Sequence, residues 1–397
     1  MMFSTSHLQP LLISALRVGM LASKFLLALY MARFLGLEAL AVFGLVAGAA
    51  ALLPMLLRMG LMTHLARAAA HADMVTIVYE LRMYGSGMAV LYLLAGALAL
   101  GIGAATGHGT LAALALGVVM AEHVAMDAFS LLNSLRRHLP ANGLLFISAG
   151  AWIYLYMAAA WWWPGLNDIH AVLLAWMLGG ALTMAMAAWL GRTWPWKDAW
   201  AKPFDSGWYK QRFGDSWRLF VSDLCTTATT YADRYLLTLF VPLNVVGAYV
   251  FFLQVSNAIN NLTGASVLLV YRPKLILAAH HEDTPALARL ERNVLRDGAG
   301  FAALAGLGAA AVMPFLVAFT GREALAAAQP LLWAMLVLTV ARAALDATRL
   351  GFFARKQDGV LMRANVLALA TLVAASALVI PPAGPVGAVF AGCVAVL

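Results

Sequence analysis

Two cations lie inside an apolar segment near the N-terminus, where charged side chains are rare. Arg17 and Lys24 are seven residues apart within residues 11–33, so on a helix they share one face, about 20° from alignment. Such a stripe could attract an anionic diphosphate group in a low-dielectric cleft. Alternatively, each cation pairs with a carboxylate or extends to the membrane surface. Both are candidate substrate-binding residues.

Three further charged residues are candidates for a gate. A shift of 206 residues superimposes the two halves of the chain and places Asp223 over Arg17. We expect an Arg17–Asp223 ion pair that holds one side shut and opens when a substrate phosphate competes for the arginine. Asp233 and Arg234 are adjacent and project about 100° apart on a helix, so we expect them to have separate partners.

A polar stripe of amides follows in the next apolar segment. Gln254, Asn257 and Asn261 recur at helical spacing within residues 245–270. Amides suit the hydroxyl groups of sugars, and these three residues are further candidates for substrate binding. Amides also join membrane helices through hydrogen bonds of about 0.6–2 kcal/mol. Both interpretations remain open from the sequence.

Two carboxylates in residues 110–132, Glu122 and Asp127, could carry a coupling proton, as buried carboxylates do in pumps. Asp127 precedes Arg136 and Arg137 by about two turns, which favours a structural salt bridge there. His123 has no second histidine at ligand spacing, so we expect no metal site.

Composition shows which elements must hold these side chains. Of the 397 residues, 63% are hydrophobic and 11% charged, against roughly 45–50% and 25% in soluble domains. About twelve apolar stretches could each cross ~30 Å of hydrocarbon as a helix. The sequence therefore predicts an all-α polytopic membrane protein. The expected spans are 11–33, 39–57, 83–105, 110–132, 144–163, 169–190, 216–241, 245–270, 298–320, 326–348, 364–380 and 384 to the end.

Charge also predicts the orientation. Most of the 26 Lys and Arg residues lie in every second connection, whereas the alternate connections hold only Arg33 and Arg322. The positive-inside rule places the cation-rich connections and both termini in the cytoplasm. Sorting the net charge of +8 in this way removes a nucleic-acid interpretation.

The spans divide into two sets of six. We expect an N-terminal lobe over residues 1–190, a cytoplasmic linker or interfacial helix over 191–215, and a C-terminal lobe over 216–397. Tryptophan mixed with lysine in the linker is typical of a helix on the membrane surface. Two pseudo-symmetric six-helix lobes around a midline cavity are a transporter architecture.

Several motifs of enzymes are missing from the chain. The sequence has no G-x-x-x-x-G-K-[ST] phosphate loop, no G-x-G-x-x-G and no H-E-x-x-H. We therefore expect no ATP hydrolysis, no cofactor, no metal and no catalytic residues. A membrane glycan polymerase or ligase would also need longer outer loops than the short ones predicted here.

Short motifs along the whole chain resemble the Wzx-like polysaccharide flippases of the multidrug/oligosaccharidyl-lipid/polysaccharide (MOP) exporter superfamily. Residues 30–44 read YMARFLGLEALAVFG and look like that family's first turn. The second half carries DRYLL at 233–237, VGAY at 246–249 and RPKL at 272–275. The resemblance implies two lobes in a V and an undecaprenyl-diphosphate-linked oligosaccharide as cargo. Lipid II flippases of the superfamily also carry cations in the first helix.

We therefore expect a flippase of the bacterial inner membrane that works by alternating access. Its expected partners are the lipid-linked oligosaccharide, the phospholipid bilayer and, as candidates, polysaccharide polymerase and chain-length proteins. The alternatives are a cation-coupled multidrug exporter of the same superfamily and a membrane glycan polymerase or ligase.

Overall fold

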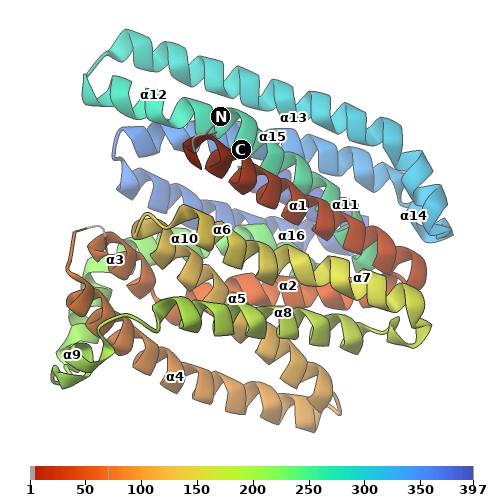
Figure 1. Cartoon of the computed structure of the whole chain (residues 1–397). Coiled ribbons are helices and arrows are strands. Elements are labelled where there is room, and N and C mark those ends of the chain that lie inside the picture. The colour runs from red at the N-terminus through yellow and green to blue at the C-terminus, as the bar shows by residue number, and fades with distance from the viewer. Residues whose placement is uncertain (1–4, 70, 397) are drawn as a thin grey trace. The chain divides into compact units, whose positions relative to one another are not determined.

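The structure is a computed structural model that describes residues 5–69 and 71–396. Figure 1 shows long helices joined by short turns, and the described residues contain no strand. The helices are α1 (Thr5–Phe34), α2 (Leu37–Arg58), α3 (Leu61–Ala68), α4 (Met74–Ala105), α5 (Gly109–Ser134), α6 (His138–Phe146), η1 (Ile147–Ala151), α7 (Trp152–Trp162), η2 (Pro164–Leu166), α8 (Ile169–Gly191), α9 (Trp196–Ala201), α10 (Gly207–Thr238), α11 (Leu243–Thr263), η3 (Gly264–Leu268), α12 (Leu269–His280), α13 (Thr284–Thr320), α14 (Glu323–Ala327), α15 (Gln329–Ala354) and α16 (Asp358–Val396).

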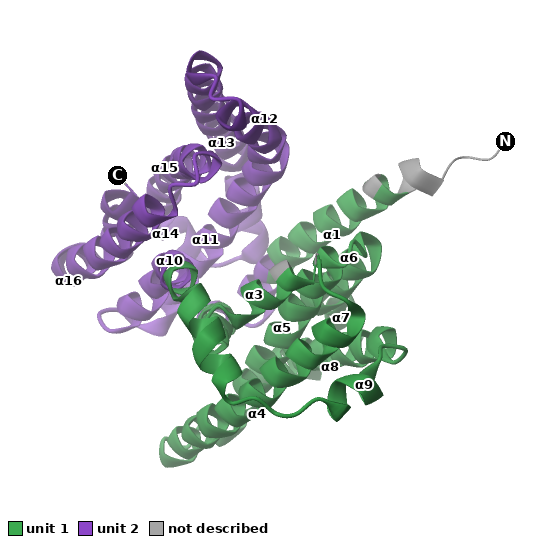
Figure 2. Ribbon diagram, turned by 90° about the vertical axis from the view of Figure 1, so that its left-hand side faces the viewer, with its two compact units in different colours: residues 1–27, 46–220 green, residues 28–45, 221–397 purple. Residues whose placement is uncertain are grey.

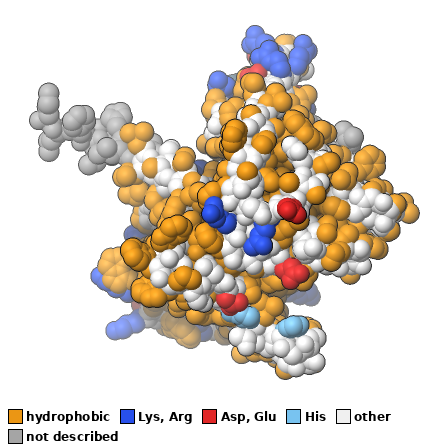
Figure 3. Space-filling view, turned by 90° about the vertical axis from the view of Figure 1, so that its right-hand side faces the viewer, with side chains coloured by type: hydrophobic (Ala, Val, Ile, Leu, Met, Phe, Trp, Pro, Cys, Tyr) orange, Lys and Arg blue, Asp and Glu red, His pale blue; other side chains and the backbone are white. Residues whose placement is uncertain are grey.

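Ten helical segments among the described residues are long and apolar enough to cross a membrane. Their outer surfaces carry exposed leucine and phenylalanine side chains, such as Leu93, Leu304 and Phe315. Hydrophobic side chains also cover most of the face in Figure 3, with few charged side chains among them. An apolar exterior of this extent suits hydrocarbon. The prediction of an all-helical polytopic membrane protein is confirmed.

The expected span 216–241 falls in α10, which is too polar to be among those ten segments. Four threonines contribute to this polarity, and each donates its hydroxyl to the carbonyl four residues earlier. These bonds satisfy the hydroxyl groups inside the helix, so the helix can remain in an apolar setting. The donors are Thr226, Thr227, Thr229 and Thr230.

The last two expected spans, 364–380 and 384 to the end, lie in one continuous element. Within α16, Gly384 has φ of 56° and ψ of −135°, which is not helical. Pro381, Pro382 and Pro385 flank it, and proline interrupts a helix because it has no N–H to donate. A positive φ strains residues with a Cβ, so glycine is suited to the bend between two helical parts of α16.

The segment expected to lie on the membrane is only partly helical. It contains the six-residue α9, and α10 already begins at Gly207, before the expected end of the linker. Arg82 of α4 donates to three carbonyls at the end of α9, those of Ala199, Trp200 and Lys202. These bonds fix the segment to α4.

The chain forms two compact units, shown in different colours in Figure 2. Unit 1 comprises residues 1–27 and 46–220, and unit 2 comprises residues 28–45 and 221–397. Three helices, α1, α2 and α10, therefore contribute to both units. These units are defined by packing, whereas the expected lobes are defined by an internal repeat, so the division at 1–190, 191–215 and 216–397 stays a prediction.

Each unit is built around long helices. In unit 1, α5 packs against α4 and α8, and Trp152 stacks on Trp176 with ring centroids 5.7 Å apart. In unit 2, α15 packs between α13 and α16 and also contacts α11. The buried side chains of α11, among them Tyr249 and Phe251, fill the interior of unit 2.

The turn between α1 and α2 belongs to unit 2 and is held there by two arginines. Arg322 donates to the carbonyls of Ala32 and Arg33 at the end of α1. Arg33 in turn donates to the carbonyl of Phe319 at the end of α13, at 2.9 Å. Each arginine thus satisfies the carbonyls and the partial negative charge at the C-terminus of the other helix. The two cations of the expected outer connections therefore have structural partners.

Close helix packing at Gly247 gives the first prediction. A Cβ added at Gly247 would lie 1.9 Å from the carbonyl oxygen of Leu37, so Gly247→Ala must separate α11 from the start of α2. Overpacking typically costs about 1–3 kcal/mol, and we expect a lower midpoint of thermal unfolding in detergent. Gly300→Ala is the control, because a Cβ there meets nothing within 4 Å. Equal unfolding midpoints for both variants would contradict this packing.

Candidate functional site

Arg17 lies exposed on the part of α1 that belongs to unit 1. Its Nε donates to Oδ1 of Asn142 at 3.0 Å. Asn142 is buried on α6 and donates through Nδ2 to the carbonyl of His138 at 2.8 Å. The arginine is therefore positioned by a neutral residue that is itself fixed, and this hydrogen bond does not cancel its charge.

Lys24 is also exposed and lies two turns further along α1. It interacts electrostatically with Glu122 of α5. Glu122 accepts a hydrogen bond of 2.6 Å from the indole nitrogen of Trp176, which is stacked on Trp152. The sequence indicated Glu122 as a candidate for a coupling proton, and its interaction with Lys24 gives this cation a counter-charge inside unit 1.

Asp223 lies exposed on the part of α10 that belongs to unit 2. Its neighbour Ser222 accepts a hydrogen bond from Asn365 of α16 at 2.9 Å, and Asn365 accepts one from Arg349 of α15 at 2.6 Å. This chain of bonds joins three helices beside Asp223. Because Arg17 belongs to unit 1, the expected Arg17–Asp223 pair stays a prediction.

Asp233 and Arg234 are buried inside unit 2. Tyr249 donates to Oδ2 of Asp233 at 2.6 Å, and Arg234 donates to the carbonyl of Gly44 at 3.1 Å. The expected separate partners are thus present. The two side chains also contact each other, with 3.6 Å between Nε of Arg234 and Oδ1 of Asp233. The assignment of this pair to a gate stays a prediction.

The amide stripe lies on α11. Gln254 and Asn257 are half-buried, and Asn261 is exposed. The helix changes to a π-helix directly after this stripe, at η3, and π-helical turns often occur at functional sites. Whether these amides contact a substrate stays a prediction.

The sequence gave no indication of a hydrogen-bonded cluster around His123. The side chain of Asp127 contacts His123 at 3.1 Å and Arg58 at 3.7 Å. The expectation that Arg136 or Arg137 pairs with Asp127 was therefore wrong about the partner, because both arginines follow the end of α5 and are exposed. Only the spacing of His123 and Asp127, one helical turn apart, could have indicated their contact.

No group of three or more His, Cys, Asp and Glu side chains that could hold a metal ion occurs among the described residues. The two cysteines, Cys225 and Cys393, are both free. The described polar groups can therefore bind anions, donate hydrogen bonds to hydroxyl groups and exchange protons, which is the chemistry of a binding and transport site.

Solved structures with the same fold are membrane transporters. The lipid II flippase MurJ in an inward-closed conformation has a TM-score of 0.73 and 13% identity, over 97% of this chain and 86% of that chain. A multidrug resistance MATE family transporter of the MOP superfamily has a TM-score of 0.64 and 14% identity, over 94% and 90%. The Vibrio cholerae MATE transporter VcmN has 0.55 and 13%, over 100% and 95%. A search of curated proteins gave no match.

The fold and the helical spans define the chain as a multi-pass membrane transporter of the MOP superfamily. A family description matches residues 12–275. The chain belongs to this family, the polysaccharide biosynthesis proteins. The resemblance to Wzx-like flippases that the sequence motifs indicated is confirmed, and the family indicates a transporter rather than a catalytic enzyme.

The burial of Asp233 gives the second prediction. Asp233→Ala removes the acceptor for Tyr249 and leaves Arg234 buried without its carboxylate, and breaking such a pair costs about 3–5 kcal/mol. We expect a large drop in the midpoint of thermal unfolding in detergent. Asp346→Ala is the control, because the Asp346 side chain is 48% exposed. If Asp233→Ala unfolds like the wild type, the residue has no structural role and the gating interpretation gains support.

Proposed function

We propose that this protein moves polyprenyl-diphosphate-linked oligosaccharides from the cytoplasmic to the outer leaflet of the bacterial inner membrane by alternating access. The observation that carries the proposal is the exposed pair of cations on α1, Arg17 and Lys24, in a member of a polysaccharide biosynthesis family. A diphosphate needs cations, and a glycan needs hydrogen-bonding groups that an apolar drug site lacks.

Arg17 is the better suited of the two cations to bind a phosphate. Its printed partner, Asn142, holds Nε and is neutral, so the guanidinium keeps its charge, and its fork of donors matches phosphate oxygens. Lys24 interacts with Glu122, so a diphosphate must compete with a carboxylate for the ammonium group. Binding at Lys24 would then release Glu122, whose remaining partner is the indole of Trp176.

Substitution of the two cations tests the diphosphate site. We expect Arg17→Gln and Lys24→Gln each to slow flipping about 10–100-fold, because a hydrogen bond to a charged group contributes about 1.5–3 kcal/mol. The measurement is the appearance of a fluorescent short-chain polyprenyl-diphosphate disaccharide in the opposite leaflet of reconstituted vesicles. Arg289→Gln, at an exposed cation of α13, is the matched control. Wild-type flipping rates in both folded variants would overturn the proposal.

Substitution of the amides tests the glycan site separately. We expect Asn257→Ala with Asn261→Ala to raise the half-saturating concentration of a substrate with several sugars about three- to tenfold, and to change that of a one-sugar substrate less, because only the longer glycan reaches the stripe. Asn244→Ala, at an exposed position near the start of α11, is the control. An equal effect on both substrates would instead assign the amides to helix packing.

The competing function is a cation-coupled multidrug exporter, since a MATE transporter shares the fold. Most such drugs are cations, and the exposed charges on α1 are positive, which disfavours binding them there. Energised vesicles that accumulate a cationic dye but do not flip the lipid-linked disaccharide would support the exporter.

A further inference from the structure

A second charged cluster lies inside unit 1, away from the exposed cations of α1. It consists of His123 and Asp127 on α5, Tyr84 and Tyr92 on α4, and Arg58 at the end of α2. None of the functions considered above uses it. His123 is only 2% exposed, and a buried ionisable group in a membrane helix needs an explanation.

Both nitrogens of the imidazole ring are engaged. Nδ1 lies 2.7 Å from the hydroxyl of Tyr92, and Nε2 lies 2.8 Å from the hydroxyl of Tyr84 and 3.1 Å from Oδ2 of Asp127. The hydroxyl of Tyr84 donates to the same carboxylate oxygen. One tautomer of neutral His123 satisfies all of these contacts, with the proton on Nε2 and a hydrogen bond donated by Tyr92 to Nδ1.

The cluster can take up one proton without large movement. A proton added at Nδ1 makes the ring a double donor, and Tyr92 then needs only to rotate its hydroxyl hydrogen to become an acceptor. Before uptake, the negative charge of Asp127 is balanced by Arg58, 3.7 Å away. After uptake, the imidazolium and Arg58 share a single carboxylate, and the imidazolium is nearer.

Proton uptake therefore weakens the contact between α2 and α5. The ion pair with Arg58 is the longer of the two contacts of Asp127, and Oδ1 of Asp127 makes no hydrogen bond to any described residue. Competition from His123, together with repulsion between two cations, favours release of Arg58. The side chain of Arg58 is 21% exposed and that of Asp127 is 13% exposed, which gives the proton a route to the buried ring.

Other titratable groups on the elements packed around α5 are engaged elsewhere. His170, the only histidine of α8, pairs with Asp168 at 2.9 Å. His138 at the start of α6 contacts Asn133 at 3.0 Å, and on α3 His64 contacts Arg212 at 3.2 Å. Glu80 of α4 binds the same arginine and Arg82 binds the end of α9, while Glu122 of α5 binds Trp176.

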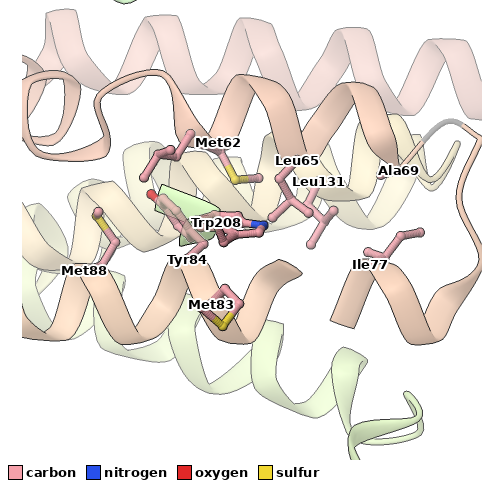
Figure 4. Close-up of a cluster of buried hydrophobic side chains, with 10 residues drawn as sticks. Met62, Leu65, Ala69, Ile77, Met83, Tyr84, Met88, Leu131 and Trp208 are labelled. Carbon is pink, nitrogen blue, oxygen red and sulfur yellow. The ribbon is translucent and has the colours of Figure 1, made fainter. Parts of the chain in front are cut away.

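Hydrophobic packing keeps the cluster dry on one side. Tyr84 belongs to a cluster of buried side chains with Met83, Met88, Leu131 and Trp208. In Figure 4, Trp208 of α10 lies next to Tyr84 among these residues. Since water is excluded there, the hydroxyl of Tyr84 must keep its protein partners, and the charge state of His123 and Asp127 acts on their immediate neighbours.

Helix α2 carries the effect beyond the cluster. Its last part, with Arg58, belongs to unit 1, and its first part, residues 37–45, belongs to unit 2. In unit 2 the carbonyls of Gly44 and Leu45 accept hydrogen bonds from Arg234 and Tyr235 of α10. A change at Arg58 is thus transmitted along one continuous helix into the second unit.

We propose that His123 and Asp127 form a proton-binding site whose occupancy controls the Asp127–Arg58 contact and, through α2, the conformational equilibrium of the transporter. The proposal rests on the proposed transport by alternating access, and it is independent of which cargo is moved. It adds a proton as the coupling ligand, bound on α5 at a distance in the chain from the cations of α1.

Distance measurements by pulsed electron paramagnetic resonance test the site without any cargo. Spin labels are attached to Thr110→Cys in unit 1 and Ala327→Cys in unit 2, two exposed positions, in a Cys225→Ser, Cys393→Ser background. Distances are recorded in lipid nanodiscs from about pH 5.5 to about pH 8.5, which spans the usual titration range of histidine. We expect the wild-type distance distribution to shift between two states across this range.

Variants on the two sides of the ion pair should lock opposite states. His123→Gln cannot take up the proton and keeps the pair, so it should remain in the high-pH distribution. Arg58→Gln and Asp127→Asn both lack the pair, so they should remain in the low-pH distribution; one suffices if the other does not fold. His138→Gln is the matched control and should shift like the wild type.

Three results would overturn the proposal: a wild-type distribution independent of pH, a His123→Gln variant that still shifts, or all variants locked in the same state. Vesicle flipping assays separate this proposal from the proposed function. A protein that changes conformation with pH but never flips the lipid-linked disaccharide retains the proton site and loses the cargo.

Discussion

An ionised group in hydrocarbon must have a partner, and this requirement organises the polar side chains of both units. Inside unit 2, Asp233 and Arg234 lie in contact, with additional bonds to Tyr249 and the carbonyl of Gly44. Arg17 differs, because the residue that positions it, Asn142, is neutral. A compensated pair stabilises the fold, whereas a positioned and uncompensated cation retains free energy for a ligand. This difference in compensation separates the structural charges from the candidate site.

Polar contacts also cluster where the three shared helices pass from one unit to the other. The changes of unit fall at residues 27/28 of α1, 45/46 of α2 and 220/221 of α10. Lys24 precedes the first, the carbonyls of Gly44 and Leu45 precede the second, and Ser222 and Asp223 follow the third. Hydrogen bonds and ion pairs are directional and can be exchanged, so these positions suit a change between discrete arrangements better than continuous apolar packing does.

Much of the fold could be predicted from the sequence because hydropathy and helix length are local properties. The polar α10 was recognised as an expected span despite its threonines, and the short connections indicated antiparallel neighbours. The site was harder to predict. The partner of Asp127 is Arg58, far away in the chain, and the support of Arg17 comes from Asn142, an unremarkable amide in an apolar segment. Such contacts depend on which helix faces meet, and one sequence without tertiary information does not contain that register.

The reciprocal caps at Arg33 and Arg322 strengthen the orientation argument. These two cations are the exceptions to the charge bias among the connections, and each binds the C-terminal carbonyls of the other's helix. Their presence on the cation-poor side follows from helix capping, so they do not count against the positive-inside distribution. On that distribution, the end of α2 with Arg58 lies on the cytoplasmic side. The His123–Asp127 cluster would then take its proton from the side on which the proposed lipid-linked cargo is loaded, and the bound proton would weaken the contact of α2 before the cargo crosses.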